Sequence, residues 1–101
     1  MTLGERVRQR RRELDLTQDD LAKALDVTPQ HISAIEQNKR APSLASLVAI
    51  AKYLGVTNDF LLTGKEGVAA EAIPAIKADK NLRPEVKKAL ISLIEELGKT
   101  S

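Results

Sequence analysis

The chain has 101 residues, enough for one compact domain with a short extension and too few for two ordinary domains. It contains no cysteine and one histidine, which excludes disulfides, thiolate metal sites and thiol nucleophiles and disfavours a histidine-rich metal cluster. No apolar run approaches the ~18 residues of a membrane span, and the charged N-terminus is unlike a signal peptide, so we expect a soluble cytoplasmic protein without a membrane partner.

Positive charge is concentrated in the first predicted helix, over residues 3–14. The net charge of the chain is only +2, yet five arginines lie between Arg6 and Arg12. Such a run is usually a solvated helix face, and contact with a nucleic acid is the alternative. We expect the side chains of Arg6, Arg8 and Arg12 to be exposed to solvent.

Four further helices are predicted from their capping residues. A threonine or serine before each one can accept a hydrogen bond from a backbone N–H of the first turn. The third helix also has Pro29 in its first position, where a missing N–H costs nothing. No run alternates with period two, so the predicted fold class is all-α. These helices begin after Thr17, Thr28, Ser43 and Thr57, and the last two end at Gly55 and Gly64.

Beyond the fifth helix the apolar pattern weakens. Residues 65–82 are predicted to be a linker with at most a weak helix around 68–72. A sixth, amphipathic helix is predicted over residues 83–98, begun by Pro84 and closed by Gly98. Its apolar stripe, at helical spacing, consists of Val86, Leu90, Leu93, Ile94 and Leu97.

The apolar stripe of the sixth helix needs a partner, because large apolar side chains left in water favour aggregation. It can fold back on its own domain or pair with a second chain, and the linker permits both. We favour pairing, and expect the five stripe residues to form a homodimer interface. The same helix can instead bind a different protein, such as an antagonist or a toxin.

The third helix has an unusual outer face. Ile32 and Ile35 have the spacing of a buried stripe. The opposite side carries short, uncharged side chains where a surface helix usually has Lys and Glu. Such groups can pair with base edges, or contact a thymine methyl, in the major groove of DNA, whereas a merely solvated polar face is the alternative. These side chains are Gln30, Ser33, Ala34 and Gln37.

The second and third helices are joined by only three residues, Asp26 to Thr28. So short a link requires a steep crossing of the helices, as in a helix-turn-helix, and the small side chain of Ala22 permits close approach. The turn needs a residue with positive φ, which Asp26 tolerates at a cost of about 1 kcal/mol. Asn38 is expected to play the same part after the third helix.

At this point the sequence resembles the Cro and phage-repressor (XRE-type) family of helix-turn-helix DNA-binding domains, over about residues 3–64. The resemblance rests on "LTQDDLAKALDVTPQHISAIEQNKRAPSLASLVAIAKYLGVTNDFLLTG". Two departures are Asp26 and Asn38, at places where the family usually has glycine. The resemblance implies a five-helix repressor-like DNA-binding domain over residues 1–64, double-stranded DNA as the partner, and no cofactor.

The outer face and the resemblance together indicate two sets of DNA contacts. In the family, the glutamine at the position of Gln18 also braces the reading helix. His31 lies on the flank of that face, where either a base contact or an ordinary surface position is open, and no metal role is expected. The expected base contacts are Thr28, Pro29, Gln30, His31, Ser33, Ala34 and Gln37. The expected phosphate contacts are Arg10, Thr17, Gln18, Asn38, Lys39, Arg40 and Ser43.

Two charged residues face the predicted core. Arg11 lies close to the buried stripe of the first helix, and Glu36 lies at a similar angle on the third helix. A buried charge is costly unless it is paired. We therefore expect Arg11 and Glu36 to form a structural ion pair, as the family resemblance also implies.

The leading functional hypothesis is a sequence-specific transcriptional regulator, in particular a dimeric repressor of a near-palindromic operator. The alternative is an interaction module of the antitoxin type, in which the sixth helix binds a partner protein. An enzyme is not expected, because the chain has no phosphate-cradling glycine loop, paired catalytic carboxylates or activated nucleophile.

Overall fold

The computed structural model describes the backbone of residues 1–65 and 73–100, and the side chains of these ranges as far as residue 97. Every regular element in these ranges is a helix, as the predicted all-α class requires. The helices are α1 (Leu3–Glu13), α2 (Gln18–Leu25), α3 (Pro29–Glu36), α4 (Leu44–Leu54), α5 (Asn58–Thr63), α6 (Ile73–Ala78) and α7 (Pro84–Thr100).

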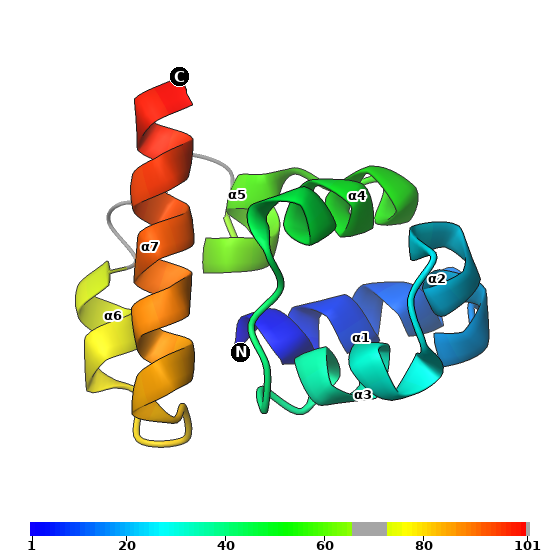
Figure 1. Ribbon diagram of the computed structural model, residues 1–101, viewed down its shortest axis with the longest axis horizontal. Coiled ribbons are helices and arrows are strands. Elements are labelled where there is room, and N and C mark those ends of the chain that lie inside the picture. Colours follow the sequence, from blue (N-terminus) through cyan, green and yellow to red (C-terminus); the bar gives the residue numbers. More distant parts are fainter. Residues whose placement is uncertain (66–72, 101) are drawn as a thin grey trace.

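The first five helices form one bundle. Helix α1 packs against α3, α4 and α5, and α2 packs against α3 and α4 (Figure 1). Burial of apolar side chains at the centre of this bundle supplies its main stabilisation. The largest fully buried apolar side chains are Leu21, Ile32, Ile35, Leu47, Ile50, Leu54, Leu61 and Val7.

The four predicted helix caps are present. Thr17, Thr28, Ser43 and Thr57 each accept a hydrogen bond from the backbone N–H three residues later. A fifth cap, which was not predicted, is Thr2, and it forms a reciprocal capping box with Glu5 at the start of α1.

The tight turns around α3 have the predicted backbone. Asp26 has φ 57°, between α2 and α3, and Asn38 has φ 59°, just after α3. Gly55 and Gly64 adopt the same left-handed region at the ends of α4 and α5. Asp15, which the sequence analysis did not single out, also has positive φ.

The predicted linker is partly helical. Helix α6 lies inside residues 65–82, and the weak helix expected around 68–72 lies outside the described residues. Helix α7 begins at Pro84 as predicted, but it does not stop at Gly98 and continues to Thr100. A glycine inside a helix costs only about 1 kcal/mol relative to alanine, so it need not end one.

The apolar stripe of α7 is covered by its own chain. Val86, Leu90, Leu93 and Ile94 are at most 5% exposed, and Leu97 is half-buried. Helix α6 packs along α7, and the two stand beside the bundle as an antiparallel hairpin (Figure 1).

The same hairpin also contacts the bundle. Leu82 and Leu90 line a small cavity together with Leu3 and Leu62 of the bundle. The fold-back arrangement, which we did not favour, is therefore the one found. Four of the five residues of the expected dimer interface are thus buried within this chain, and pairing of two chains through the stripe stays a prediction.

Within the described ranges, no helix combines the length and the apolar character that crossing a bilayer requires.

Candidate nucleic-acid interface

Helix α3 buries one side and exposes the other. Ile32 and Ile35 are 0% and 1% exposed and fix the helix to the core. Gln30 and Gln37 are exposed on the other side, and Ser33 and Ala34 between them are half-buried. The outer face therefore offers amide, hydroxyl and methyl groups without any charge.

The amides on this face differ in their partners. The Gln37 Nε2 donates to the Ser33 Oγ at 2.8 Å, so two of the expected base contacts are bonded to each other. The Gln30 amide has no hydrogen-bond partner among the residues that the structure describes. Gln30 is thus the side chain most available to a ligand.

The start of α3 is held by local bonds. The Thr28 Oγ1 accepts from the His31 backbone N–H at 3.2 Å, and Pro29 takes the first helical position. The Thr28 hydroxyl therefore caps the helix, while His31 is half-buried on the flank of the outer face.

Behind α3 lies the predicted ion pair. Glu36 is 1% exposed, and its two carboxylate oxygens accept from the Nε and Nη2 of Arg11 at 2.8 and 3.0 Å. The Nη1 of Arg11 donates to the Leu16 carbonyl at 2.8 Å, so the guanidinium also holds the loop before α2. Such a two-pronged pair fixes orientation as well as distance.

Gln18 connects α2 to this pair. Its Nε2 donates to the Glu36 Oε1 at 3.2 Å, and the Arg8 Nε lies 3.5 Å from the same oxygen. The Gln18 side chain therefore braces α3 from inside. This is the bracing role that the family resemblance implied, and a phosphate contact by Gln18 stays a prediction.

The charge on Glu36 responds to these neighbours. Burial raises the pKa of the Glu36 carboxyl, but the hydrogen bonds from Arg11 and Gln18 and the nearby arginine charges outweigh it, so the pKa lies below its ordinary value of 4.5. The same hydrogen bond to Glu36 raises the pKa of Arg11. The pair is therefore ionised at neutral pH.

This lowered pKa predicts acid sensitivity. A carboxyl group with a lower pKa in the folded state stabilises the fold above its unfolded pKa, and that stability is lost as the pH falls through the folded pKa. The free energy of unfolding should therefore decrease below about pH 4.5. Urea titrations between pH 7 and 3 should show a weaker acid dependence for Glu36→Gln than for the wild type. Equal slopes for the two proteins would contradict the assignment.

The expected phosphate contacts fall into two groups. Lys39 and Arg40 are exposed directly after α3, where their backbone N–H groups donate to the Ala34 carbonyl. Neither side chain has a hydrogen bond or ion pair with another described residue. Thr17 and Ser43 are also exposed, but their hydroxyls cap α2 and α4. The two cations are thus the best placed to bind a phosphate with their side chains.

Two of the expected phosphate contacts are engaged elsewhere. The Asn38 Nδ2 donates to the Thr2 Oγ1 at 2.8 Å, and its Oδ1 accepts from the Gly4 backbone N–H at 3.2 Å. The Arg10 Nε donates to the Leu54 carbonyl at 2.9 Å, at the C-terminal end of α4. Both side chains tie helix ends together, and a phosphate contact by either of them stays a prediction.

Arg6 was expected to be solvated and is instead buried. Its guanidinium donates to the Leu61 and Leu62 carbonyls at 2.7 and 2.8 Å, and also to the Met1 carbonyl. The last carbonyls of a helix have no N–H donor within the helix. The Arg6 guanidinium supplies hydrogen-bond donors to two such carbonyls of α5. Burial lowers the pKa of Arg6. Arg6 lies three residues after Leu3, which belongs to the buried stripe of α1, and this helical spacing could have predicted the burial of Arg6.

The sequence analysis also missed Gly4, where α1 meets the end of α3. A Cβ atom at this position would lie 2.4 Å from the Ile35 carbonyl oxygen and 2.6 Å from that of Glu36. Only glycine permits so close an approach of one backbone to another.

In the part of the chain that the structure describes, no three His, Cys, Asp or Glu side chains gather closely enough to hold an ion.

The arrangement of α2 and α3 agrees with a known family. The sequence model of the helix-turn-helix family matches residues 7–61, more than half of the chain. The chain belongs to this family. It is the helix-turn-helix family of phage repressors and transcriptional regulators, and not a family of enzymes.

Two curated relatives of this helix-turn-helix protein cover almost all of its length. It is 33% identical to the HTH-type transcriptional regulator DicA of Escherichia coli over 96% of the chain, and 31% identical to the immunity repressor protein of Bacillus phage phi105 over 98%. The chain spans 63% and 64% of the lengths of these two proteins.

A solved structure is similar to the bundle. The P22 c2 repressor, crystallised in complex with a synthetic operator, superimposes with a TM-score of 0.62 and is 35% identical. The match covers 64% of this helix-turn-helix protein and 98% of the other chain. The family model itself ends at residue 61, before α6 and α7.

Proposed function

We propose that this chain is a sequence-specific DNA-binding transcriptional regulator that inserts α3 into the major groove. The observation that carries the proposal is the outer face of α3, which is polar, uncharged and exposed on a helix held from behind by Arg11 and Glu36. Surface helices that only meet water do not need this rigidity. The names of the relatives, and the operator bound to the similar repressor, support the proposal.

The face has the groups that base readout requires. A glutamine amide can pair with the N6 and N7 positions of adenine, and a methyl group can contact the thymine methyl. Gln30 and Ala34 would supply these two contacts, with Ser33, Gln37 and His31 beside them. The hydroxyl of Thr28 and the ring of Pro29 would lie nearest the groove wall.

Phosphate contacts would set the position of the helix on the duplex. Lys39 and Arg40 would contact one strand beyond the C-terminal end of α3. At the start of α2, the backbone N–H of Gln18 would approach a phosphate, since N–H groups at a helix N-terminus attract anions. The backbone N–H of Thr17 donates to the Asp20 carboxylate, so Thr17 would reach the phosphate with its hydroxyl. The capping residue Ser43 would do the same at α4.

We further propose that two copies repress transcription from a near-palindromic operator. One such domain reads only a few base pairs, and dimeric helix-turn-helix proteins read half-sites about 34 Å apart. In this conformation the α7 stripe is covered by its own chain, so pairing of two copies through the stripe would require this cover to open. Binding of an antagonist or a toxin to the stripe would require the same opening.

A selection from random duplexes at a stated salt concentration tests the proposal. An enriched sequence with two-fold symmetry would support both readout and the dimer. Equal affinity for enriched and scrambled duplexes would overturn the proposed function, and an enriched site without symmetry would overturn only the dimer.

Gln30→Ala should weaken binding to the best site by about 1–3 kcal/mol and relax the base preference at one position. The reason is that Gln30 is the exposed amide without an internal partner. Titrations of the enriched duplex and of its single-base variants measure both effects. Gln9→Ala, an exposed glutamine on α1, is the control. An equal loss on enriched and random DNA would count against base readout by Gln30.

Lys39→Ala should weaken binding to every duplex by a similar factor. A phosphate contact releases a counterion, so its loss should flatten the slope of log K against log salt by about one unit. Salt titrations on enriched and random duplexes measure the slope. Lys52→Ala, on the exposed side of α4, should leave it unchanged. A Lys39→Ala slope equal to that of the control would contradict the assignment.

A further inference from the structure

The hairpin of α6 and α7 carries an excess of positive charge. Between residues 77 and 88 there are five basic and two acidic side chains, a local net charge of +3, against +2 for the whole chain. Surfaces that serve only solubility usually mix the two signs. The basic side chains are Lys77, Lys80, Arg83, Lys87 and Lys88.

The side chains of most of these cations form no hydrogen bond or ion pair with a described residue. Lys87 is the exception, since its Nζ donates to the Lys77 carbonyl at 2.9 Å and so closes the end of α6. The exposed side chains of Lys80 and Arg83 form no hydrogen bond or ion pair with a described residue. Neither contributes an interaction to the fold that explains its charge.

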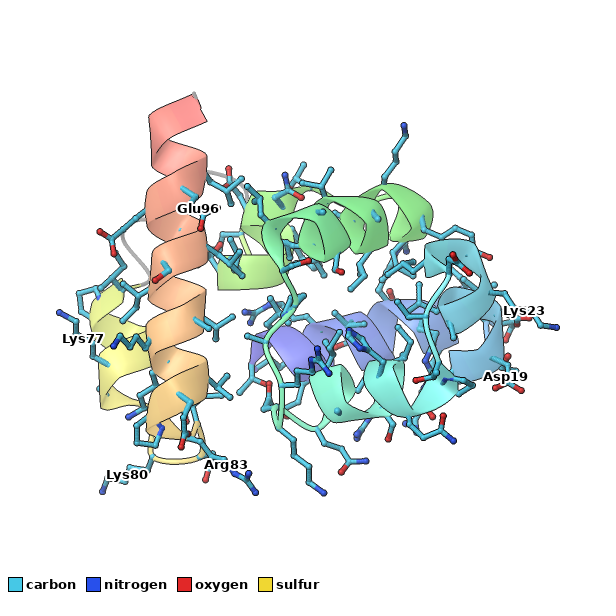
Figure 2. All side chains as sticks on the ribbon, in the orientation of Figure 1. Asp19, Lys23, Lys77, Lys80, Arg83 and Glu96 are labelled. Atoms are coloured by element: carbon cyan, nitrogen blue, oxygen red, sulfur yellow. The ribbon has the colours of Figure 1, made fainter. Side chains whose placement is uncertain are left out.

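The turn that carries Lys80 and Arg83 is anchored. The Asn81 backbone N–H donates to the Asp79 Oδ1 at 2.8 Å, and the side chain of Leu82 is 7% exposed. The two cations therefore project from a fixed point of the surface. Figure 2 shows both of them pointing outward from the lower end of the hairpin.

The turn lies next to the end of α3. Asn38, which follows α3, is bonded to Thr2 and Gly4 of the first turn of α1. Thr2 in turn lines a cavity of about 110 Å³ with Asp79 and Leu82 of the hairpin. The path from α3 through the start of α1 to the turn is thus continuous. In Figure 1, α3 and the turn both lie along the lower side of the molecule.

We propose that Lys80 and Arg83 extend the DNA-contacting surface beyond the helix-turn-helix unit. They would bind phosphates next to those reached by Lys39 and Arg40, on the side of the C-terminal end of α3. The contact would be to the backbone and would carry no base preference. This inference rests on the proposed function, since it requires a duplex seated on α3.

The occupant is the same duplex rather than a separate acidic partner. The outer face of α3 carries no charge, so affinity for a duplex depends on cations around it. The hairpin supplies two such cations on the same side of the molecule as Lys39 and Arg40 (Figures 1 and 2). An acidic protein bound at the turn is the competing outcome of the experiment.

The experiment compares three full-length proteins on the enriched duplex over a salt series. They are the wild type, Lys80→Ala/Arg83→Ala, and the charge-matched control Lys23→Ala/Lys52→Ala, whose residues are exposed elsewhere on the bundle. The hairpin variant should bind on the order of tenfold more weakly at 0.1 M salt, with a slope shallower by about 1.8 units for two contacts. The control should keep close to the wild-type slope.

Duplexes with one methylphosphonate each then locate the contacts. Neutralising phosphates beside the Lys39-dependent ones should weaken the wild type and the control but not the hairpin variant. A hairpin variant that matches the control in slope and in phosphate map would overturn this inference, and an acidic protein at the turn would then be the better explanation. A wild type without preference for the enriched duplex would overturn the proposed function as well, so the two failures are distinct.

Discussion

Glu36→Ala should lower the free energy of unfolding by about 3 kcal/mol or more, because it leaves Arg11 partly buried without its counter-charge. The carboxylate accepts two hydrogen bonds from Arg11 and one from Gln18, so its removal frees three donors at once. Urea or thermal unfolding at pH 7 measures the loss. Glu95→Ala, an exposed carboxylate on α7, should change stability by less than about 0.5 kcal/mol.

A double variant distinguishes two causes of the lost stability: the cost of leaving the Arg11 charge unpaired, and the loss of the attraction between Arg11 and Glu36. Replacing a whole buried pair by apolar residues is often neutral, whereas removing one partner is costly. Arg11→Met/Glu36→Leu should therefore be more stable than Glu36→Ala alone. If the double variant were less stable, the ion pair itself would hold the fold, and our account of the single variant would be wrong.

Glu36→Ala should also weaken DNA binding if α3 is the helix that contacts the bases. Among the described residues, the side-chain hydrogen bonds from Gln18 and Arg11 to α3 go to Glu36, so loss of its carboxylate removes this brace behind the outer face. The affinity for the enriched duplex should fall even at temperatures where the variant stays folded. Circular dichroism on the same samples checks that condition.

Gly4→Ala should cost about 3 kcal/mol, near the upper end of the range for inserting an atom into a packed interior. The added Cβ would lie 2.4 and 2.6 Å from two backbone carbonyl oxygens, which cannot rotate away as a side chain can. Relief requires α1 to move from the end of α3, which would also break the Asn38 bond to the Gly4 N–H. Denaturant unfolding measures the change.

The control for this variant is Gln9→Ala, which places the same residue on an exposed position of α1. Alanine favours helix formation, so the control should be neutral or slightly stabilising. Gly4→Ala with unchanged stability would mean that α1 and α3 are not in this close contact.

The helix starts were predictable from sequence because capping is local. A hydroxyl at Thr17 or Thr57 meets an N–H three residues away whatever the rest of the chain does. The Arg11–Glu36 pair was predictable for a related reason. Both residues lie near an apolar stripe, and buried opposite charges have few ways to be satisfied.

The tertiary contacts of α1 were not predictable in the same way. The helical spacing of Arg6 and Arg10 placed them near the buried face, but nothing local showed that the ends of α5 and α4 lie within their reach. Gly4 carries no side chain, so no pattern marks it. Its role depends on where α3 ends in space.

The C-terminal part shows a different limit. An amphipathic stripe indicates that α7 must be covered, and the cover itself depends on α6, which lies in the segment with the weakest pattern. Apolar spacing therefore identified the buried side chains of α7 but not their partners.

The bond between Gln37 and Ser33 has a consequence for how strictly the two ends of α3 would discriminate. If α3 lies in the major groove and the base opposite Gln37 is unsuitable, the Gln37 amide can keep its hydrogen bond to the Ser33 hydroxyl. Gln30 has no such internal acceptor among the described residues. A mismatched base opposite it would leave its desolvated amide without a hydrogen bond, which costs the full desolvation free energy of that group. Base discrimination should accordingly be strict at the base pairs opposite Gln30, near the start of α3, and weak at those opposite Gln37, near its end. Related operators should therefore vary most at the base pairs opposite Gln37.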